Sequence, residues 1–225
     1  MTDRPYLVFP ETVQRDLTHY LRNTFVDESP EQKQINIDAA RQSLPEISLR
    51  PEEGWLLYFL VKLAKVKVGV EIGTLAGYSA SWIARALPDD GKLICLEVDS
   101  HHASIANNNM KRLGFADKVE IIVGDAHDTL DGMDGQYDMV FIDADKTSYP
   151  YYLDWSLNHL RSGGLLLAHN AFQNGLIVEN PENLEEQWRD STRAMQEFNQ
   201  RVAGDVRLTS IIVPVGDGLL AAIMD

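Results

Sequence analysis

Two short segments place polar side chains directly after apolar runs, where burial without partners would be costly. In "FIDADK" these are Asp143, Asp145 and Lys146, and in "LLLAHN" they are His169 and Asn170. Carboxylate, amide and imidazole groups are ligands for divalent metals, and a lysine or histidine can accept a proton during catalysis. The spacing of these residues is equally compatible with a surface ion network. The secondary-structure elements that hold the two segments therefore determine whether a site is expected.

The apolar pattern predicts the elements that would position these residues. Short apolar runs typical of buried strands lie at 68–73, 92–99, 118–125, 137–145 and 163–170. Helices are predicted before and between them, at 10–23, 30–43, 50–64, 78–87, 101–113, 126–132 and 148–160. Continuous apolar strands separated by helices indicate a parallel sheet covered on both faces. Consecutive strands of such a sheet usually lie side by side, which would bring His169 and Asn170 near Asp143.

The last part of the chain predicts an antiparallel hairpin. A helix at 182–203 is followed by "VRLTSIIVPV" and "GLLAAIMD", joined through Gly216, Asp217 and Gly218. Glycine-rich turns between two apolar segments are typical of hairpins. We therefore predict an α/β protein with a seven-stranded, mostly parallel sheet, a C-terminal antiparallel hairpin and helices on both faces. The segment 171–188 is a candidate lid over the sheet edge.

Composition limits the class of protein. The 225 residues suit one domain, and the formal net charge of -14 argues against nucleic acid and an anionic membrane as partners, because both attract clustered Lys and Arg. Cys95 is the only cysteine and lies in an apolar run, which predicts a core thiol in a reducing compartment. Neither a signal peptide nor a membrane-spanning segment is visible, so a cytoplasmic location is expected.

The segment "EIGTLAGYSA", which ends the first predicted strand, is typical of a ligand-binding loop. Gly73 and Gly77 would let a ligand approach the backbone where the strand turns into a helix. The dinucleotide fingerprint needs a further glycine where this chain has Leu75, so a nicotinamide dehydrogenase is disfavoured. Glu97 ends the second predicted strand, where an acid can accept hydrogen bonds from both hydroxyls of a ribose. Together these residues predict a nucleoside ligand.

Several motifs, taken together, resemble one family. "VEIGTLAGYSA", "CLEVD", "GDA", "FIDADKTSYPYYL" and "SGGLLLAHN" are similar to the small class I S-adenosylmethionine-dependent O-methyltransferases, in particular the caffeoyl-CoA and catechol O-methyltransferases and their bacterial relatives. The resemblance implies a Rossmann-like fold, S-adenosyl-L-methionine as methyl donor, a small hydroxylated, catechol-like aromatic acceptor, and a homodimer. A single domain, 1–225, would then combine an N-terminal helical region for substrate or dimer contacts, 1–47, with a cofactor-binding core, 48–225.

The cofactor contacts that the resemblance implies lie at the carboxyl ends of the first four predicted strands. They are Glu71, Gly73, Tyr78 and Ser79 around the methionine part, Glu97 at the ribose, Asp125 and Ala126 at the adenine, and Asp143 at the amino end. In the resembling family, the acid at position 143, an acid at position 169 and Asn170 also bind a divalent cation, often Mg²⁺. That metal lowers the pKa of the acceptor hydroxyl and orients its oxygen, and the lysine at position 146 takes up the proton.

This chain departs from the family pattern because His169 stands where an acid is expected, and three readings follow. In the first, Asp143, His169 and Asn170 hold Mg²⁺, Mn²⁺ or, since imidazole suits them better, a softer ion such as Zn²⁺, Fe²⁺, Co²⁺ or Ni²⁺, with Asp145 as a supplementary ligand. In the second, no metal binds and His169 is the general base, because unperturbed imidazole has a pKa of about 6.5. In the third, His169 is structural and the protein binds its cofactor without catalysis.

Overall fold

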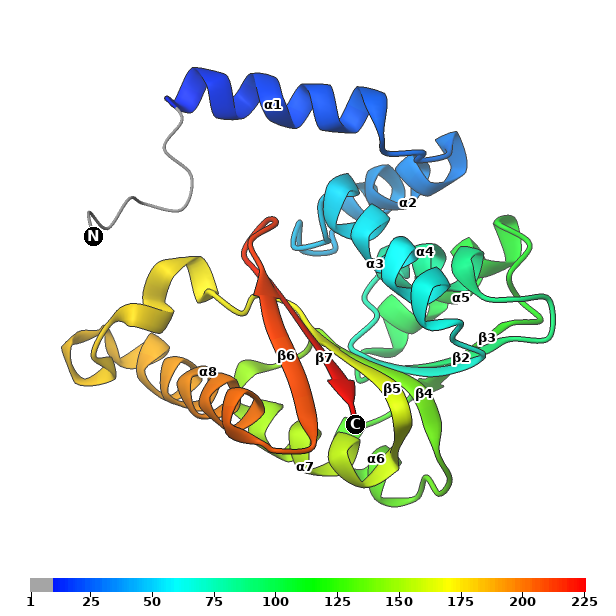
Figure 1. Cartoon of the computed structure of the whole chain (residues 1–225). Helices are drawn as coiled ribbons and strands as arrows, with labels where there is room; N and C mark the ends of the chain where they lie inside the picture. Colours follow the sequence, from blue (N-terminus) through cyan, green and yellow to red (C-terminus); the bar gives the residue numbers. More distant parts are fainter. Residues whose placement is uncertain (1–9) are drawn as a thin grey trace.

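Seven strands form one sheet at the centre of the part of the chain that the structure describes, residues 10–225 of a computed structural model (Figure 1). The strands are β1 Val68–Ile72, β2 Lys92–Glu97, β3 Val119–Val123, β4 Tyr137–Ile142, β5 Leu160–Ala168, β6 Leu208–Val213 and β7 Leu219–Met224. Their order in the sheet is β3-β2-β1-β4-β5-β7-β6. Strands β1 to β5 are parallel, whereas β7 is antiparallel to both β5 and β6. The predicted seven-stranded sheet with its C-terminal hairpin is confirmed.

Helices cover both faces of this sheet, as Figure 1 shows. One face packs against α2 (Pro30–Arg41), α3 (Pro51–Ala64), α4 (Tyr78–Ala86) and α5 (Ser100–Arg112). The other face packs against α6 (Ala126–Asp131), α7 (Tyr149–His159) and α8 (Glu186–Gly204). Three short 3₁₀ turns complete the connections: η1 Lys146–Ser148, η2 Gln173–Val178 and η3 Pro181–Asn183.

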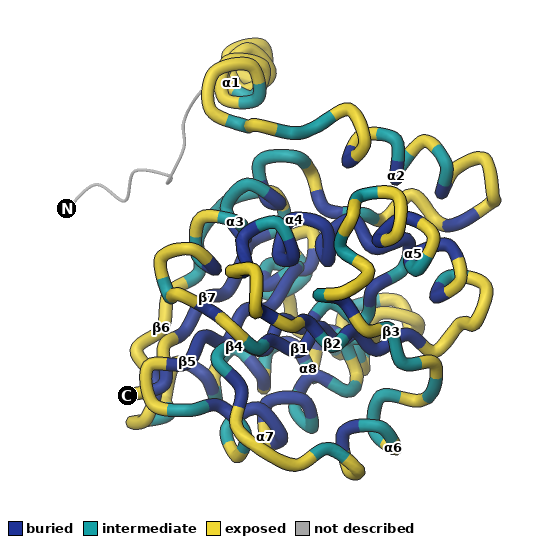
Figure 2. Tube along the Cα trace, turned by 90° about the vertical axis from the view of Figure 1, so that its right-hand side faces the viewer, coloured by how far each residue is buried: buried dark blue, intermediate teal, exposed yellow. Residues whose placement is uncertain are grey.

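Strand β4 explains why the sequence shows continuous apolar runs. Met139 and Phe141 belong to the hydrophobic cluster on the α2–α5 side, and Val140 and Ile142 belong to the cluster on the α6–α8 side. A strand covered on both faces must be apolar at every position, not at every second one. Figure 2 shows the central strands as the buried part of the molecule. The single cysteine, Cys95 on β2, is a buried thiol as predicted.

The strand order reverses between β1 and β4. From β1 the sheet continues to β2 and β3 on one side, and the chain then returns to place β4 on the other side of β1. Ligands of such sheets bind at this switch point, beyond the carboxyl ends of the strands. Two backbone hydrogen bonds join the strand ends there: the N–H of Asp143 donates to the carbonyl of Ile72 (2.9 Å), and the N–H of His169 donates to the carbonyl of Ile142 (3.0 Å).

The start of α3 carries an acidic side chain into the protein interior. Glu53 Oε2 accepts a hydrogen bond of 2.7 Å from the backbone N–H of Arg50, which caps the first turn of the helix. The carboxylate also complements the positive end of the helix dipole. Although both effects are common at exposed helix starts, Glu53 is only 2% exposed. Its second oxygen points to the edge of the sheet where β5 ends.

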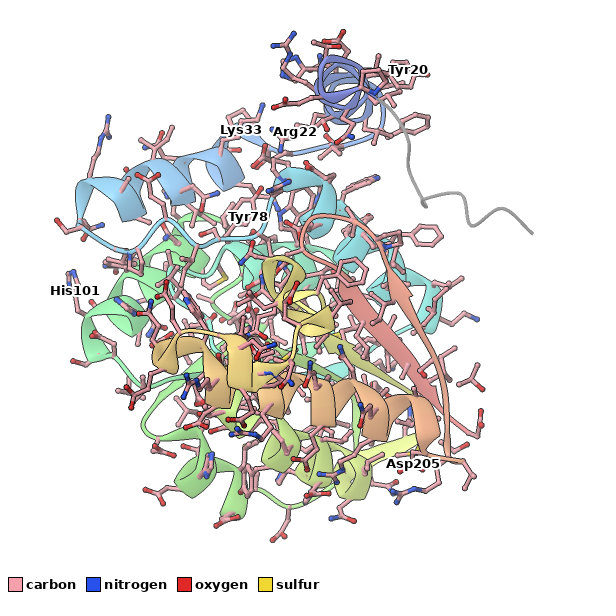
Figure 3. All side chains as sticks on the ribbon, turned by 90° about the vertical axis from the view of Figure 1, so that its left-hand side faces the viewer. Tyr20, Arg22, Lys33, Tyr78, His101 and Asp205 are labelled. Carbon is pink, nitrogen blue, oxygen red and sulfur yellow. The ribbon has the colours of Figure 1, made fainter. Side chains whose placement is uncertain are left out.

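Helix α1 (Glu11–Thr24) extends away from the rest of the molecule (Figures 1 and 2). No residue of this helix is buried within the described chain. One ion pair, between Arg22 Nε and Glu52 Oε2 at 2.7 Å, joins it to α3. Figure 3 shows Tyr20 and Arg22 projecting from it.

The C-terminal part of the chain differs from the prediction at two boundaries. Strand β5 begins at Leu160, not at 163, and α8 begins at Glu186, not at 182. The η3 turn, with Pro181 at its first position, precedes the helix, and Leu184 has an extended backbone that ends the turn. No helix among residues 10–225 is long and apolar enough to cross a membrane.

Candidate functional site

A cavity of about 740 Å³ opens at the carboxyl ends of β1, β4 and β5. Its wall includes most of the predicted site residues: Gly73, Tyr78, Ser79, Asp143, Lys146, His169 and Asn170. The other predicted residues lie outside that wall, at the ends of β1, β2 and β3: Glu71, Glu97, Asp125 and Ala126. A volume of this size suits a small organic ligand.

Gly73 allows β1 and β4 to meet at the switch point. Its φ is +89°, and a Cβ at this position would lie 2.2 Å from the carbonyl oxygen of Asp143. Leu75, in the same loop, also has a positive φ of 48°, which a side chain other than glycine rarely adopts. Strained backbone of this kind is found at ligand sites, where the surrounding structure holds it. The conformation of the loop therefore depends on the close contact between Gly73 and the backbone of Asp143, and not on its glycines alone.

Glu71 places a carboxylate with a spare oxygen beside this loop. The side chain is fully buried, and its Oε2 accepts a hydrogen bond of 2.6 Å from Thr74 Oγ1. Its Oε1 has no hydrogen-bond partner among the described residues. Burial raises the pKa of Glu71 to about 7, against the lowering effect of hydrogen bonds from Ser79 and Thr74. An ammonium group brought here would satisfy the spare oxygen and favour the ionised carboxyl.

Glu97 and Asp125 hold backbone N–H groups at the neighbouring strand ends. Glu97 Oε2 accepts hydrogen bonds from the backbone of Leu75 (2.8 Å) and Thr74 (3.3 Å), so this acid ties β2 to the glycine loop. Asp125 accepts from the backbone N–H of His127 at 2.8 Å and caps α6. Both acids lie at the correct edge for a nucleoside, and their contacts with ribose and adenine stay predictions.

Tyr78 contacts the N-terminal helical region. Its hydroxyl donates to Glu28 Oε1 at 2.6 Å, between α1 and α2. Figure 3 shows Tyr78 beneath the N-terminal helices. Tyr78 lines the cavity, and because its hydroxyl is bound to Glu28, its predicted role at the methionine part of the cofactor would rest on the ring.

The surroundings of Lys146 disfavour the charged form of its amine. Its Nζ lies 3.4 Å from Asp143 Oδ1 and donates to Tyr149 Oη at 2.6 Å. The Tyr149 hydroxyl is itself held by the carbonyls of Ile142 and His169, each at 3.2 Å. Burial lowers the pKa of Lys146, and the opposing effect of Asp143 is smaller. A lowered pKa suits a lysine that accepts a proton.

His169 lies between two carboxylates. Its Nε2 lies 2.9 Å from Glu53 Oε1, and its Nδ1 lies 3.2 Å from Asp143 Oδ2. The second contact has ion-pair distance without hydrogen-bond alignment, because Nδ1 has no aligned acceptor in residues 10–225. Burial lowers the pKa of His169, but the two carboxylates together raise it more, so that the pKa is about 9. A raised pKa favours the protonated ring over the neutral form that a general base needs. The roles predicted for His169 stay predictions.

The expected metal ligands are already engaged with one another and with their neighbours. The Asn170 amide donates to Asp217 Oδ2 at 3.2 Å, and Asp217 Oδ1 accepts from the backbone N–H of Asn174 at 2.7 Å. Asp145, the supplementary candidate, caps η1 by accepting from the backbone of Ser148 at 2.9 Å. In residues 10–225 no three His, Cys, Asp or Glu side chains are grouped to hold a metal ion. Asn170 is not of these types, so the fit of the expected ligands depends on His169. Both of its ring nitrogens face carboxylates, and it offers no free nitrogen to the divalent cation that the resemblance implies.

Three acids of the cavity wall were not predicted: Glu46, Glu53 and Asp217. Glu53 has the local sequence of an ordinary helix start, and Asp217 has that of a hairpin turn, so neither shows a signal for a site residue. The predicted lid, 171–188, contributes Gln173, Asn174 and Trp188 to the cavity wall. Ile47, from the segment before α3, lies on the same wall.

The sequence and the fold match known proteins. A family model described as O-methyltransferase matches residues 22–224. A catechol O-methyltransferase from Niastella koreensis is 38% identical over 194 residues, 82% of this chain and 86% of that protein. The crystal structure of an O-methyltransferase from Bacillus cereus in complex with SAH is 28% identical, has a TM-score of 0.86 and covers 93% of this chain and 97% of its own. An O-methyltransferase from Streptomyces achromogenes involved in tomaymycin synthesis, in complex with SAM, is 29% identical, with a TM-score of 0.86 and coverage of 96% and 99%.

Proposed function

Because this chain belongs to the O-methyltransferase family and is an S-adenosylmethionine-dependent enzyme, we propose that it methylates a hydroxyl of a small catechol-like or other hydroxylated aromatic compound. The observation that carries this proposal is Lys146, a buried amine with a lowered pKa at the end of β4, in the wall of the cavity. The Niastella koreensis relative is a catechol O-methyltransferase, which supports the class of acceptor.

The residues at the switch point fit the methyl donor. The donor's ammonium group would reach Asp143 and, behind it, the spare oxygen of buried Glu71, with Gly73, Ser79 and Tyr78 around the methionine part. Glu97 would bind the ribose, and Asp125 and Ala126 would lie at the adenine. When bound, S-adenosylmethionine supplies an electrophilic methyl group on a sulfonium.

Lys146 would prepare the acceptor oxygen for attack. A neutral phenol is a weak nucleophile, so the hydroxyl proton passes to the neutral amine at Nζ as the oxygen forms its bond to the methyl carbon. The carbon–sulfur bond breaks in the same in-line displacement, and its electron pair stays on sulfur. Tyr149 fixes the amine through a hydrogen bond of 2.6 Å, and burial lowers the pKa of the amine, which favours its neutral form.

The outer wall of the cavity offers apolar surface for an aromatic ring. Ile47 and Trp188 line the cavity and are 67% and 46% exposed, so their side chains are open to a ligand. Aromatic and aliphatic walls with a few polar groups are usual in small-molecule sites. We expect the ring of the acceptor to lie against these two side chains with a hydroxyl toward Lys146.

A homodimer in the cytoplasm is the proposed form of the enzyme. Support for the dimer comes from the apolar side chains that α1 leaves exposed: Val13, Leu17, Tyr20, Leu21 and, just after the helix, Phe25. An apolar surface of this kind on an isolated helix is typical of a contact with another chain. The cytoplasmic location stays a prediction from the single cysteine.

Methyl transfer to a catechol probe tests the proposal. Lys146→Met should lower kcat by roughly 10²- to 10⁴-fold, the usual range for loss of a proton acceptor, and leave donor affinity by calorimetry nearly unchanged. Lys33→Met is the matched control, because Lys33 is an exposed lysine on α2 (Figure 3). A full rate in Lys146→Met would refute the role of the lysine. Donor binding by the wild type without transfer to any hydroxylated aromatic would instead indicate a noncatalytic cofactor-binding protein.

A further inference from the structure

The contacts of the His169 ring determine which protons it carries. A neutral imidazole has one N–H and one lone pair, so either tautomer would turn a lone pair toward a carboxylate oxygen. Those oxygens are Glu53 Oε1, 2.9 Å from Nε2, and Asp143 Oδ2, 3.2 Å from Nδ1. A ring with a proton on each nitrogen makes both contacts attractive. The geometry is that of one cation between two anions.

The contacts continue beyond the ring. Asp143 turns its other oxygen, Oδ1, toward Lys146 Nζ at 3.4 Å. Each oxygen of Asp143 therefore already has a nitrogen partner. Both nitrogens of the His169 ring face carboxylate oxygens, so neither is free to bind a divalent cation. An ion that reached Asp143 would have to displace these contacts and also lose water.

The turn between β6 and β7 covers the same side chains. Gly216 approaches Glu53 so closely that a Cβ there would lie 1.8 Å from Glu53 Oε1. The next residue, Asp217, binds the Asn170 amide at 3.2 Å. Mg²⁺ needs oxygen ligands in near-octahedral geometry and usually keeps several waters. Here the space next to Glu53 is taken by the backbone of Gly216. The Asn170 amide nitrogen is held by Asp217, so that only the amide oxygen remains to ligate an ion.

We propose that His169 takes the place of a divalent cation between Glu53 and Asp143, so that no metal binds at this site and methyl transfer proceeds without one. Only the last clause rests on the proposed function, since metal binding can be measured without turnover. His169 is a positioning residue in this arrangement: it fixes Asp143, and Asp143 holds Lys146. Glu53 positions the ring in turn.

Metal titration tests the inference directly. Wild-type protein, stripped with EDTA and saturated with S-adenosylhomocysteine, is titrated calorimetrically with MgCl₂, MnCl₂, CoCl₂ and ZnCl₂. We expect no saturable binding tighter than about 1 mM, and a methyl-transfer rate in EDTA within about twofold of the untreated rate. His169→Asp replaces the cation by an oxygen ligand and should tighten Mg²⁺ or Mn²⁺ binding at least about tenfold. His101→Asp, at an exposed histidine on α5 (Figure 3), is the control and should gain none.

Two further results keep the test decisive. Should His169→Asp fail to fold, ¹⁵N-histidine NMR of the wild type at pH 7.5 should still show His169 protonated on both nitrogens. Binding of one ion per wild-type chain at micromolar affinity, lost in His169→Ala, overturns the inference, as does a rate that falls in EDTA and returns with added metal. If the wild type binds no ion and transfers no methyl group, the proposed function fails and the absence of a metal site stands. If it transfers methyl only with a metal, the function stands and the inference fails.

Discussion

Replacing Glu53 by glutamine should change how stability depends on pH. The pKa of His169 is about 9 in the folded protein and 6.5 for a free imidazole. Because the folded state binds this proton more tightly, the ring stabilises the fold fully below pH 6.5, and that stabilisation is lost as the pH rises through 9. The interval between the two values corresponds to about 3 kcal/mol of unfolding free energy.

The structure sets the size of the change in Glu53→Gln. The variant keeps an acceptor for Nε2 but loses one of the two charges beside the ring. A hydrogen bond to a charged group contributes about 1.5–3 kcal/mol and a neutral one about 0.5–1.5 kcal/mol. The difference, about 1–1.5 kcal/mol, should lower the pKa of His169 to about 8. The variant should then lose only about 1–2 kcal/mol of unfolding free energy over the pH interval in which the wild type loses about 3 kcal/mol. The two stability curves should converge as the pH rises.

Urea unfolding at intervals from pH 6 to pH 9.5 measures this convergence. Glu52→Gln is the matched control, because Glu52 lies in the same first turn but pairs with Arg22. That contact raises the pKa of Arg22, which lies above the measured range. Its curve should run parallel to that of the wild type. Titration of Glu71, with its pKa of about 7, is common to all three proteins and cancels in the differences. A constant difference between Glu53→Gln and wild type across the range would refute the assignment of a protonated ring.

Three other changes test separate parts of the structure. Gly73→Ala should destabilise the protein by about 2 kcal/mol or more and abolish donor binding, because a Cβ would lie 2.2 Å from a backbone oxygen. The control is Gly135→Ala, where φ is also positive but a Cβ would meet open space within the described chain. In thermal unfolding it should shift Tm less than Gly73→Ala does. Glu71→Gln should remove the pH dependence of donor binding. In calorimetry, the affinity of the wild type for the donor should rise as the Glu71 carboxyl ionises and level off above pH 7. A wild-type affinity that does not change with pH would disprove the contact between Glu71 and the ammonium group. Leu17→Glu on α1 should turn the dimer into a monomer in light scattering, and an unchanged mass would place the interface elsewhere.

The sheet was predictable because each buried strand has its own apolar sequence pattern. A strand such as β4, covered on both faces, needs apolar residues at every position, and the sequence shows that run without reference to any partner. The glycine loop was predictable for a similar reason, since a strand that turns into a helix at a switch point needs Gly73. Asp143, Lys146, His169 and Asn170 were expected together because the ends of neighbouring parallel strands share one edge.

The partner of His169 was not predictable from the sequence. Glu53 is 116 positions away and follows Pro51 at a helix start, where an acid is already explained by capping and by the helix dipole. Its burial depends on the turn at Gly216, which packs over it from the other end of the chain. The chemistry of the imidazole therefore depends on two long-range contacts. Without them, an unperturbed histidine was the only available reference, and it suggested a metal ligand or a base.

The turn between β6 and β7 also determines when the site can be completed during synthesis. Glu53, Asp143 and His169 all leave the ribosome before residues 216–218. Until the final hairpin inserts, β5 keeps an unpaired edge, because β7 is the strand that covers it. A nascent chain that lacks the hairpin has an uncovered Glu53 and no Asp217 to bind the Asn170 amide. The part of the cavity around Glu53 and Asn170 is therefore the last to form.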